Sequence, residues 1–118
     1  MATQKLEAMA AKGEKLVAKI VGTKPTPKLA PFDVVDFSDG YAYEVKTVSR
    51  LALNGSNKIR ISDGAWTRKQ AFLDEYDLVG ILVVVVIGGP KDIEVYSLPL
   101  DRQHIRISRA IRLGDKLA

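Results

Sequence analysis

The feature of the sequence that most constrains the fold is the apolar run from Val79 to Gly89, VGILVVVVIGG. Its middle, Gly80–Ile87, is dominated by valine, and β-branched side chains of this kind favour strands. Because no polar residue alternates with the apolar ones, both faces of the strand must be covered, as in the centre of a sheet with helices on each side. The run is far shorter than the roughly 20 residues that a membrane-spanning helix needs. We therefore expect a buried central strand and no membrane partner.

The segments around this strand predict a mixed sheet flanked by helices. Apolar residues from Thr3 to Val21 recur at helical spacing with Gly13 as a weak point, and Ser62 or Asp63 caps a second helix that ends near Tyr76. The proline-rich stretch 22–31 is a connector, and a basic segment from Pro99 onward is partly helical. Strands are predicted at 32–37, 41–48, 58–61, 80–87 and 93–98. The expected fold is a single α/β domain spanning residues 1–118, in the order α-β-β-β-α-β-β plus the basic C-terminal segment.

The composition restricts the kinds of metal site that the chain can form. There is no cysteine and only one histidine, His104, which excludes disulfides, thiolate sites and multi-histidine zinc sites. A bound metal must therefore be held by oxygen atoms, which suit Mg²⁺ or Mn²⁺. The first residues carry charges throughout and lack the long apolar segment of a secretory signal, so a cytoplasmic location is expected.

The positive charges are unevenly distributed. The net charge is +4 at pH 7, and basic residues gather in the C-terminal segment and in the middle of the chain. Such clusters suit a polyanionic partner, although they also occur as solvated charges on ordinary surfaces. The residues concerned are Arg102, Arg106, Arg109, Arg112 and Lys116 in the first group, and Lys58, Arg60, Arg68 and Lys69 in the second.

Three charged residues are expected to converge on a predicted hairpin that turns at Ser38-Asp39-Gly40. Asp33 lies near the start of its first strand, and Glu44 and Lys46 on the second are separated by one residue, so they share a face. Charges in an otherwise apolar strand are costly unless they bind a metal, pair with each other or reach solvent.

The sequences Pro31-Phe32-Asp33 and Glu44-Val45-Lys46 resemble the signature of the PD-(D/E)XK nuclease superfamily, which has the restriction-endonuclease-like fold. That signature is an acidic residue opening one strand and Glu-x-Lys on the next. The resemblance is strongest over the hairpin and extends from Glu14 to Ile87. In size and layout the chain is most similar to archaeal and phage Holliday-junction resolvases. It departs from the pattern because Phe32 separates the proline from the aspartate.

The resemblance implies a Mg²⁺-dependent DNA endonuclease in which Mn²⁺ can substitute. Asp33 and Glu44 would bind the metal together with the backbone carbonyl of Val45. Lys46 would orient or help to deprotonate the attacking water.

In the resolvase-like branch a glutamate of the first helix also approaches the metal, and Glu14 is the best match, with Glu7 as the weaker alternative. The alternative for Glu14 itself is a solvated helix glutamate that pairs with Lys15 or Lys19.

The expected partner is DNA, branched or duplex, bound by a homodimer. Either strand 80–87 or strand 93–98 would contribute the dimer interface. Some branches of the superfamily place a lysine or glutamine of the second helix near the scissile phosphate. The predicted DNA contacts are Arg50, Lys58, Arg60, Arg68, Lys69 and Gln70.

Other functions stay open at this point. The chain could be a small restriction or homing-type endonuclease, or a nucleic-acid-binding module that keeps the fold without cleaving. It could also be a structural protein in which Glu44 and Lys46 form a surface pair and Asp33 merely starts a strand.

Overall fold

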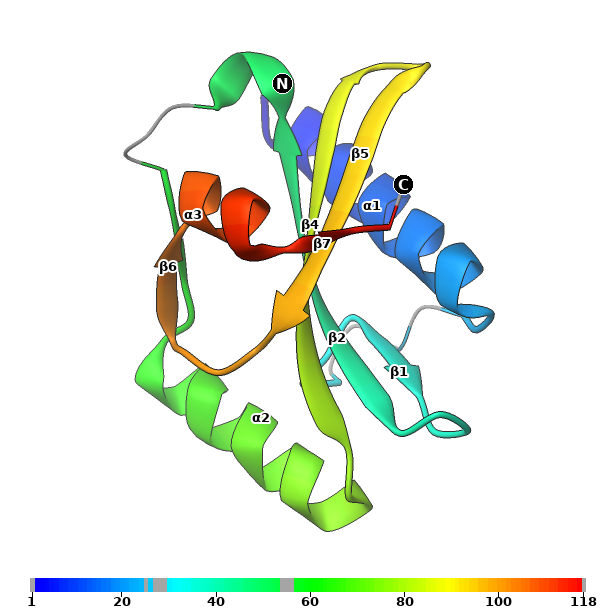
Figure 1. The fold of residues 1–118 in the computed structure, drawn as a ribbon, viewed down its shortest axis with the longest axis vertical. Coiled ribbons are helices and arrows are strands. Elements are labelled where there is room, and N and C mark those ends of the chain that lie inside the picture. The colour runs from blue at the N-terminus through cyan, green and yellow to red at the C-terminus, as the bar shows by residue number, and fades with distance from the viewer. Residues whose placement is uncertain (1, 25, 27–29, 54–56, 118) are drawn as a thin grey trace.

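Strand β4 forms the centre of the main sheet, as its composition predicts (Figure 1). The computed structural model describes residues 2–24, 26, 30–53 and 57–117, with the side chains of 2–7 and 52 outside that description. β4 pairs in parallel with β2 and antiparallel with β5. In spatial order the sheet consists of β1 (Val34–Asp36), β2 (Tyr41–Ser49), β4 (Val79–Gly89), β5 (Asp92–Pro99) and β7 (Asp115–Lys116).

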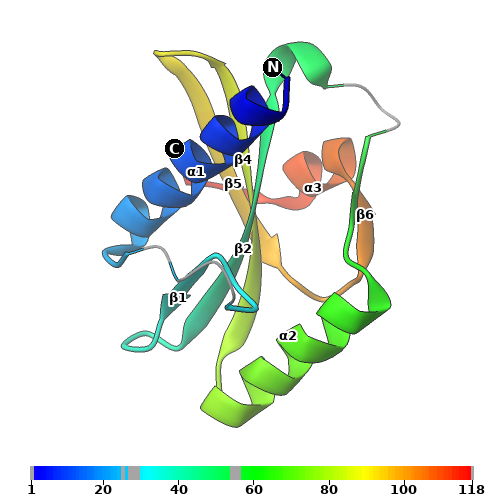
Figure 2. The same ribbon diagram turned by 180° about the vertical axis from the view of Figure 1, so that it is seen from behind.

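Alternate residues of β4 supply two hydrophobic cores, one on each face of the sheet. Val83 and Val85 pack against α1 (Ala2–Val21), whereas Val84 and Val86 belong to the core that includes residues of α2 and α3. All four valines are at most 1% exposed. Figures 1 and 2 show α1 on one side of the sheet and α3 on the other. The second core is completed by α2 (Asp63–Tyr76) and α3 (Ile107–Leu113).

The two long helices begin and end close to the predicted positions. Ser62 caps α2, where its hydroxyl oxygen accepts from the backbone N–H of Ala65 at 3.3 Å, as expected for a serine at this position. Helix α1 continues through Gly13 without the break that this residue suggested. Gly13 is buried instead, and a Cβ built there would lie 1.8 Å from Thr47 Oγ1 of β2. The glycine therefore serves the close approach of helix and sheet.

The third predicted strand is present, and the C-terminal segment contains more structure than the sequence predicted. The predicted strand at 58–61 does not join the main sheet: β3 (Lys58–Arg60) pairs antiparallel with β6 (His104–Arg106) in a separate small sheet. The basic C-terminal segment, expected to be partly helical, contains α3 and also the strands β6 and β7, which the sequence did not predict. A 3-10 turn, η1 (Arg50–Ala52), follows β2. The radius of gyration is 13.6 Å, close to the roughly 13.5 Å expected for one domain of this length.

The pairing of the strands also excludes one predicted dimer interface. β4 has a hydrogen-bonded neighbour on each edge and a core on each face, so a second protomer cannot pair with it along either edge. β5 is paired on its other edge by β7 at Tyr96 and Ser97. Among the residues that the structure describes, no helix combines the length and apolar character that a membrane crossing requires.

We predict that Gly13→Ala destabilises the protein by about 1–3 kcal/mol, because the new methyl group overpacks the contact with Thr47. Urea unfolding would measure the change. Gly64→Ala near the start of α2 is the matched control, because its Cβ meets only Arg68 at 3.6 Å; it should be neutral or stabilising by up to about 1 kcal/mol. Adding Thr47→Ala to Gly13→Ala should recover stability. A gain in stability from Gly13→Ala alone would contradict this account.

Candidate functional site

The register of the β1–β2 hairpin brings Asp33 level with Glu44. Val34 pairs with Tyr43, so one residue further along the antiparallel strands Asp33 stands opposite Glu44. Two hydrogen bonds hold Asp33 there: its N–H donates to the Tyr43 carbonyl at 3.1 Å, and its Oδ2 accepts from the Val45 N–H at 2.8 Å. The two acidic residues of the predicted motif are therefore neighbours in space.

Glu44 and Lys46 lie on the face of β2 that is turned toward α2. Residues two positions apart in a strand share a face, so Glu44 and Lys46 lie on the same face as Ala42 and Val48. Both of these belong to the core that contains residues of α2. The side chain of Glu44 is 22% exposed, whereas Lys46 is exposed. Lys46 makes no hydrogen bond or ion pair among the described residues. Its ammonium group is therefore available to solvent or a ligand beside Glu44.

Lys69 of α2 lies beside the hairpin and pairs with Glu44, a contact that the sequence did not predict. Its Nζ donates to Glu44 Oε1 at 3.1 Å and to the carbonyl oxygen of Pro31, and it lies 4.8 Å from the centroid of the Phe32 ring. Lys69 is only 7% exposed, and its contact to DNA stays a prediction. A buried ammonium group needs such partners, because burying an unpaired charge is costly.

A sequence signal for the position of Lys69 did exist. Trp66, Lys69 and Leu73 fall on one helical stripe at spacings of three and four residues, and this stripe faces the core. A lysine on a buried stripe predicts a nearby carboxylate. The sequence alone does not identify Glu44 as that carboxylate.

The pKa of Glu44 is raised to about 7, first by burial and then by the neighbouring charge of Asp33, while Lys69 opposes the shift. Because the pKa of Glu44 stays raised, Lys69 offsets the effects of burial and of Asp33 only in part. Two carboxylates held close together disfavour the state in which both are ionised.

Glu14 of α1 approaches the same aspartate from the helix. Burial raises the pKa of Glu14, and so do the charge of Asp33 and a hydrogen bond to it. The alternative of local pairing finds no support, since no ion pair joins Glu14 to Lys15 or Lys19 in the described part of the chain. The side chain of Glu7 lies outside the described residues.

The carboxylates meet in pairs through Asp33 and do not form a closed metal cage. Within the described residues no group of three or more His, Cys, Asp or Glu side chains is arranged to hold a metal ion. Asp33 Oδ1 and Glu44 Oε2 accept no N–H hydrogen bond there, whereas the other oxygen of each carboxylate does. Two carboxylate oxygens with a third carboxylate nearby fit the chemistry of a hard divalent cation.

The other predicted DNA contacts are distributed over the end of β2, helix α2 and the small sheet. Arg50 binds Asp92 through Nε and Nη2, at 2.8 and 2.7 Å, and Glu94 through Nη2 at 2.6 Å. These bonds join the end of β2 to β5 and engage Nε and Nη2 of the guanidinium group, and the predicted DNA contact of Arg50 stays a prediction. Arg68 is exposed and Gln70 half-buried on α2. Lys58 and Arg60 are exposed on the small sheet.

Comparison of the chain with protein-family models, with curated proteins and with solved structures found no match.

We predict that the free energy of unfolding falls by about 1–3 kcal/mol between about pH 5 and about pH 8. Since the folded-state pKa of Glu44 is about 7 against the usual 4.5, the folded protein binds more protons than the unfolded chain in this window. The resulting stability is present at low pH and is lost as the pH rises through 7. Glu44→Gln should flatten the dependence, and Glu75→Gln, an exposed change on α2, should not. An unchanged slope in Glu44→Gln would refute the assignment.

We also predict that Lys69→Met costs about 1.5–3 kcal/mol at about pH 8, because it removes charged hydrogen bonds and leaves Glu44 beside Asp33 without a cation. The cost should be smaller at about pH 5, where Glu44 takes up a proton. Arg68→Met, on the exposed side of the same helix, serves as the control. Urea unfolding of both variants at the two pH values measures the difference, and equal costs at both would count against the pairing.

Proposed function

We propose that this chain is a Mg²⁺-dependent nuclease that hydrolyses phosphodiester bonds in DNA. The observation that carries the proposal is the juxtaposition of Asp33 and Glu44 on adjacent strands, with Lys46 exposed on the same face as Glu44. Such a pair of carboxylates beside a lysine matches the arrangement that the resemblance to PD-(D/E)XK nucleases implies.

The electrostatics of the pair support a divalent cation. Asp33 raises the pKa of Glu44 and that of Glu14, and Lys69 offsets only part of the shift at Glu44, so a further positive charge would favour the ionised form of both glutamates. Asp33 Oδ1, Glu44 Oε2 and the carbonyl of Val45 would hold the ion, and Glu14 would support it. When bound, Mg²⁺ supplies positive charge for the phosphoryl oxygens and lowers the pKa of a bound water.

The residues of the chain have separate tasks in this proposal. Lys46 donates hydrogen bonds to the attacking water or to a phosphate oxygen, where charge develops in the transition state. The Val45 N–H fixes the orientation of Asp33 by its bond to Oδ2. Lys69 fixes Glu44 by its bond to Oε1 and so turns Oε2 toward the site.

A small basic domain of this kind suits DNA recognised by its backbone and shape, since phosphate contacts carry no sequence information. Branched DNA is the substrate that the resemblance favours. The homodimer and the cytoplasmic location stay predictions.

A second candidate is a nucleic-acid-binding module without catalysis. The observation that favours it is Lys69, whose buried ammonium group already neutralises part of the charge at Glu44. In such a module the ammonium group would take the place of a metal, and divalent ions would not affect the protein.

Cleavage of labelled four-way junction, flap, duplex and single-stranded DNA in Mg²⁺ or Mn²⁺ tests the proposal. We expect metal-dependent cutting that Glu44→Gln and Lys46→Ala each reduce by about 10²-fold or more, because both remove groups that act on the reacting atoms. Asp39→Asn in the exposed turn of the hairpin should leave the rate unchanged.

Thermal unfolding separates the two candidates independently of the substrate chosen. A ligand that binds only the folded state raises the melting temperature, so Mn²⁺ should stabilise the wild type and not Asp33→Asn. Absence of both cleavage and Mn²⁺ stabilisation would support the module and refute the nuclease.

A further inference from the structure

The small sheet formed by β3 and β6 presents basic side chains on its outer face. Each of its strands is three residues long, with a buried isoleucine between two exposed residues. Ile59 and Ile105 are each 6% exposed and join the core. The four outward positions are occupied by Lys58, Arg60, His104 and Arg106, none of which is acidic.

The strand register sets these residues directly against one another. Lys58 stands opposite Arg106, and Arg60 opposite His104. Like charges directly opposite on an antiparallel pair are destabilising. In the part of the chain that the structure describes, neither Lys58, Arg60 nor Arg106 forms an ion pair that would relieve this repulsion. The repulsion between these cross-strand charges is therefore not relieved by ion pairs, whereas Arg50 and Lys69 are each paired with a carboxylate.

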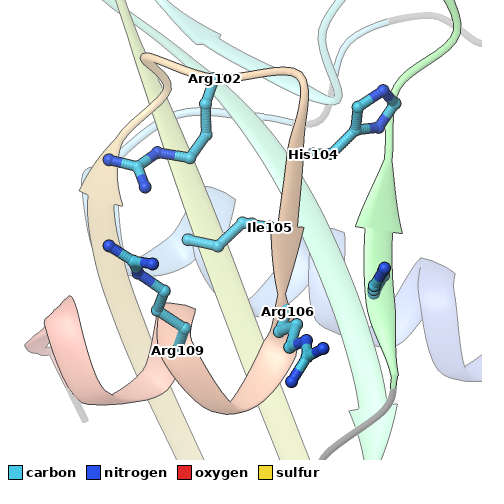
Figure 3. Close-up of a pocket in the computed structure, with 6 residues that line it drawn as sticks. Arg102, His104, Ile105, Arg106 and Arg109 are labelled. Atoms are coloured by element: carbon cyan, nitrogen blue, oxygen red, sulfur yellow. The ribbon is translucent and has the colours of Figure 1, made fainter.

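Two further arginines extend the basic surface toward α3. The hollow beside β6 is lined by Arg102 and Arg109 together with Lys58, His104, Ile105 and Arg106. Figure 3 shows the guanidinium groups of Arg102 and Arg109 turned toward one another on the same side of β6. Arg102 is paired with Asp101 at 3.0 Å, and Arg109 has no ion pair among the described residues.

We propose that this basic ribbon, defined as Lys58, Arg60, His104 and Arg106 with Arg102 and Arg109 beside it, binds the phosphate backbone of duplex DNA. Outward residues of one strand are about 6.6 Å apart, so the charges are spread along an open surface instead of converging on one small anion. Lysine and arginine are the usual partners of phosphate oxygens, and each contact releases counterions from the duplex.

The position of the ribbon relates it to the candidate active site. Ile59 and Ile105 pack in the same core as Ala42 and Val48 of β2, so the ribbon lies on the side of the main sheet toward which Glu44 and Lys46 are turned. β3 leads through Ser62 into α2, which carries Lys69. The identity of the ligand rests on the proposed function, whereas the ribbon itself is a separate binding surface outside the hairpin.

Binding of a labelled duplex in EDTA at several salt concentrations tests the ribbon without any cleavage. Lys58→Ala/Arg106→Ala should weaken binding about 10- to 100-fold and reduce the slope of log K against log salt by about 2, one for each lost phosphate contact. Lys15→Ala/Lys91→Ala removes the same charge from exposed positions on α1 and the β4–β5 turn and is the matched control. Equal losses in both double variants would overturn the proposal, since they would indicate attraction by net charge alone.

Arg106→Glu distinguishes a binding role from a structural one. It replaces a repulsive cross-strand pair with an attractive one, so it should raise the melting temperature by about 1–4 °C while weakening DNA binding at least tenfold. Unchanged affinity for the duplex in this variant, including the case in which the ribbon serves an acidic protein, would overturn the proposal. Wild-type binding in EDTA without any metal-dependent cleavage would count against the nuclease and leave the ribbon supported.

Discussion

The structure depends on the burial of β4 on both faces and its pairing along both edges. Its valines contribute alternately to the two cores, so α1 on one side and the helices on the other are held by the same strand. Apolar burial of this kind is the main favourable term in folding. The parallel pairing with β2 runs from Tyr41 and Val79 to Ser49 and Ile87 without a shift. This register fixes β2, and with it the residues of the candidate site.

The candidate site places carboxylates close together, which is electrostatically unfavourable for the folded protein. The hairpin register sets Asp33 against Glu44, and Glu14 of α1 approaches the same aspartate, so Asp33 has two carboxylate neighbours at the edge of an apolar core. One ammonium group, that of Lys69, offsets this in part. Clusters with perturbed pKa values are frequent at functional sites, because the arrangement that a reaction needs is seldom the most stable one. The partly offset negative charge is the basis on which we propose a divalent cation here.

The acidic residues of the candidate site and the basic residues of the ribbon differ in burial and in hydrogen bonding. The carboxylates are half-buried and receive backbone and lysine hydrogen bonds. The cations of the ribbon are exposed and oppose one another across strands. A metal-assisted hydrolase acting on a polyanion requires both arrangements, one to hold a small cation and one to hold a long chain of phosphates. Arg50 differs from both groups, because its bonds to Asp92 and Glu94 join the end of β2 to β5.

Much of the local structure could be predicted from the sequence, because periodicity and turn chemistry act over a few residues. Ser62 predicted the start of α2, Gly40 the hairpin turn, where its φ is +82°, and the valine run the central strand. The pairing of Asp33 with Glu44 followed from the same local reasoning, since two strands joined by a tight turn must lie side by side.

Only the tertiary structure decided which distant segments meet. The outward positions of β3 are basic in the sequence, but their opposition to those of β6 depends on a pairing across more than forty positions, from Lys58 to Arg106. Lys69 belongs to the site because α2 packs beside the hairpin, and Gly13 is buried because α1 crosses β2 at Thr47. The sequence by itself thus determined most of the elements and the acidic hairpin, through forces that depend on neighbouring residues. The partner of Lys69 and the basic ribbon came from long-range packing, in which many pairings satisfy the same local pattern and only the shared core selects one.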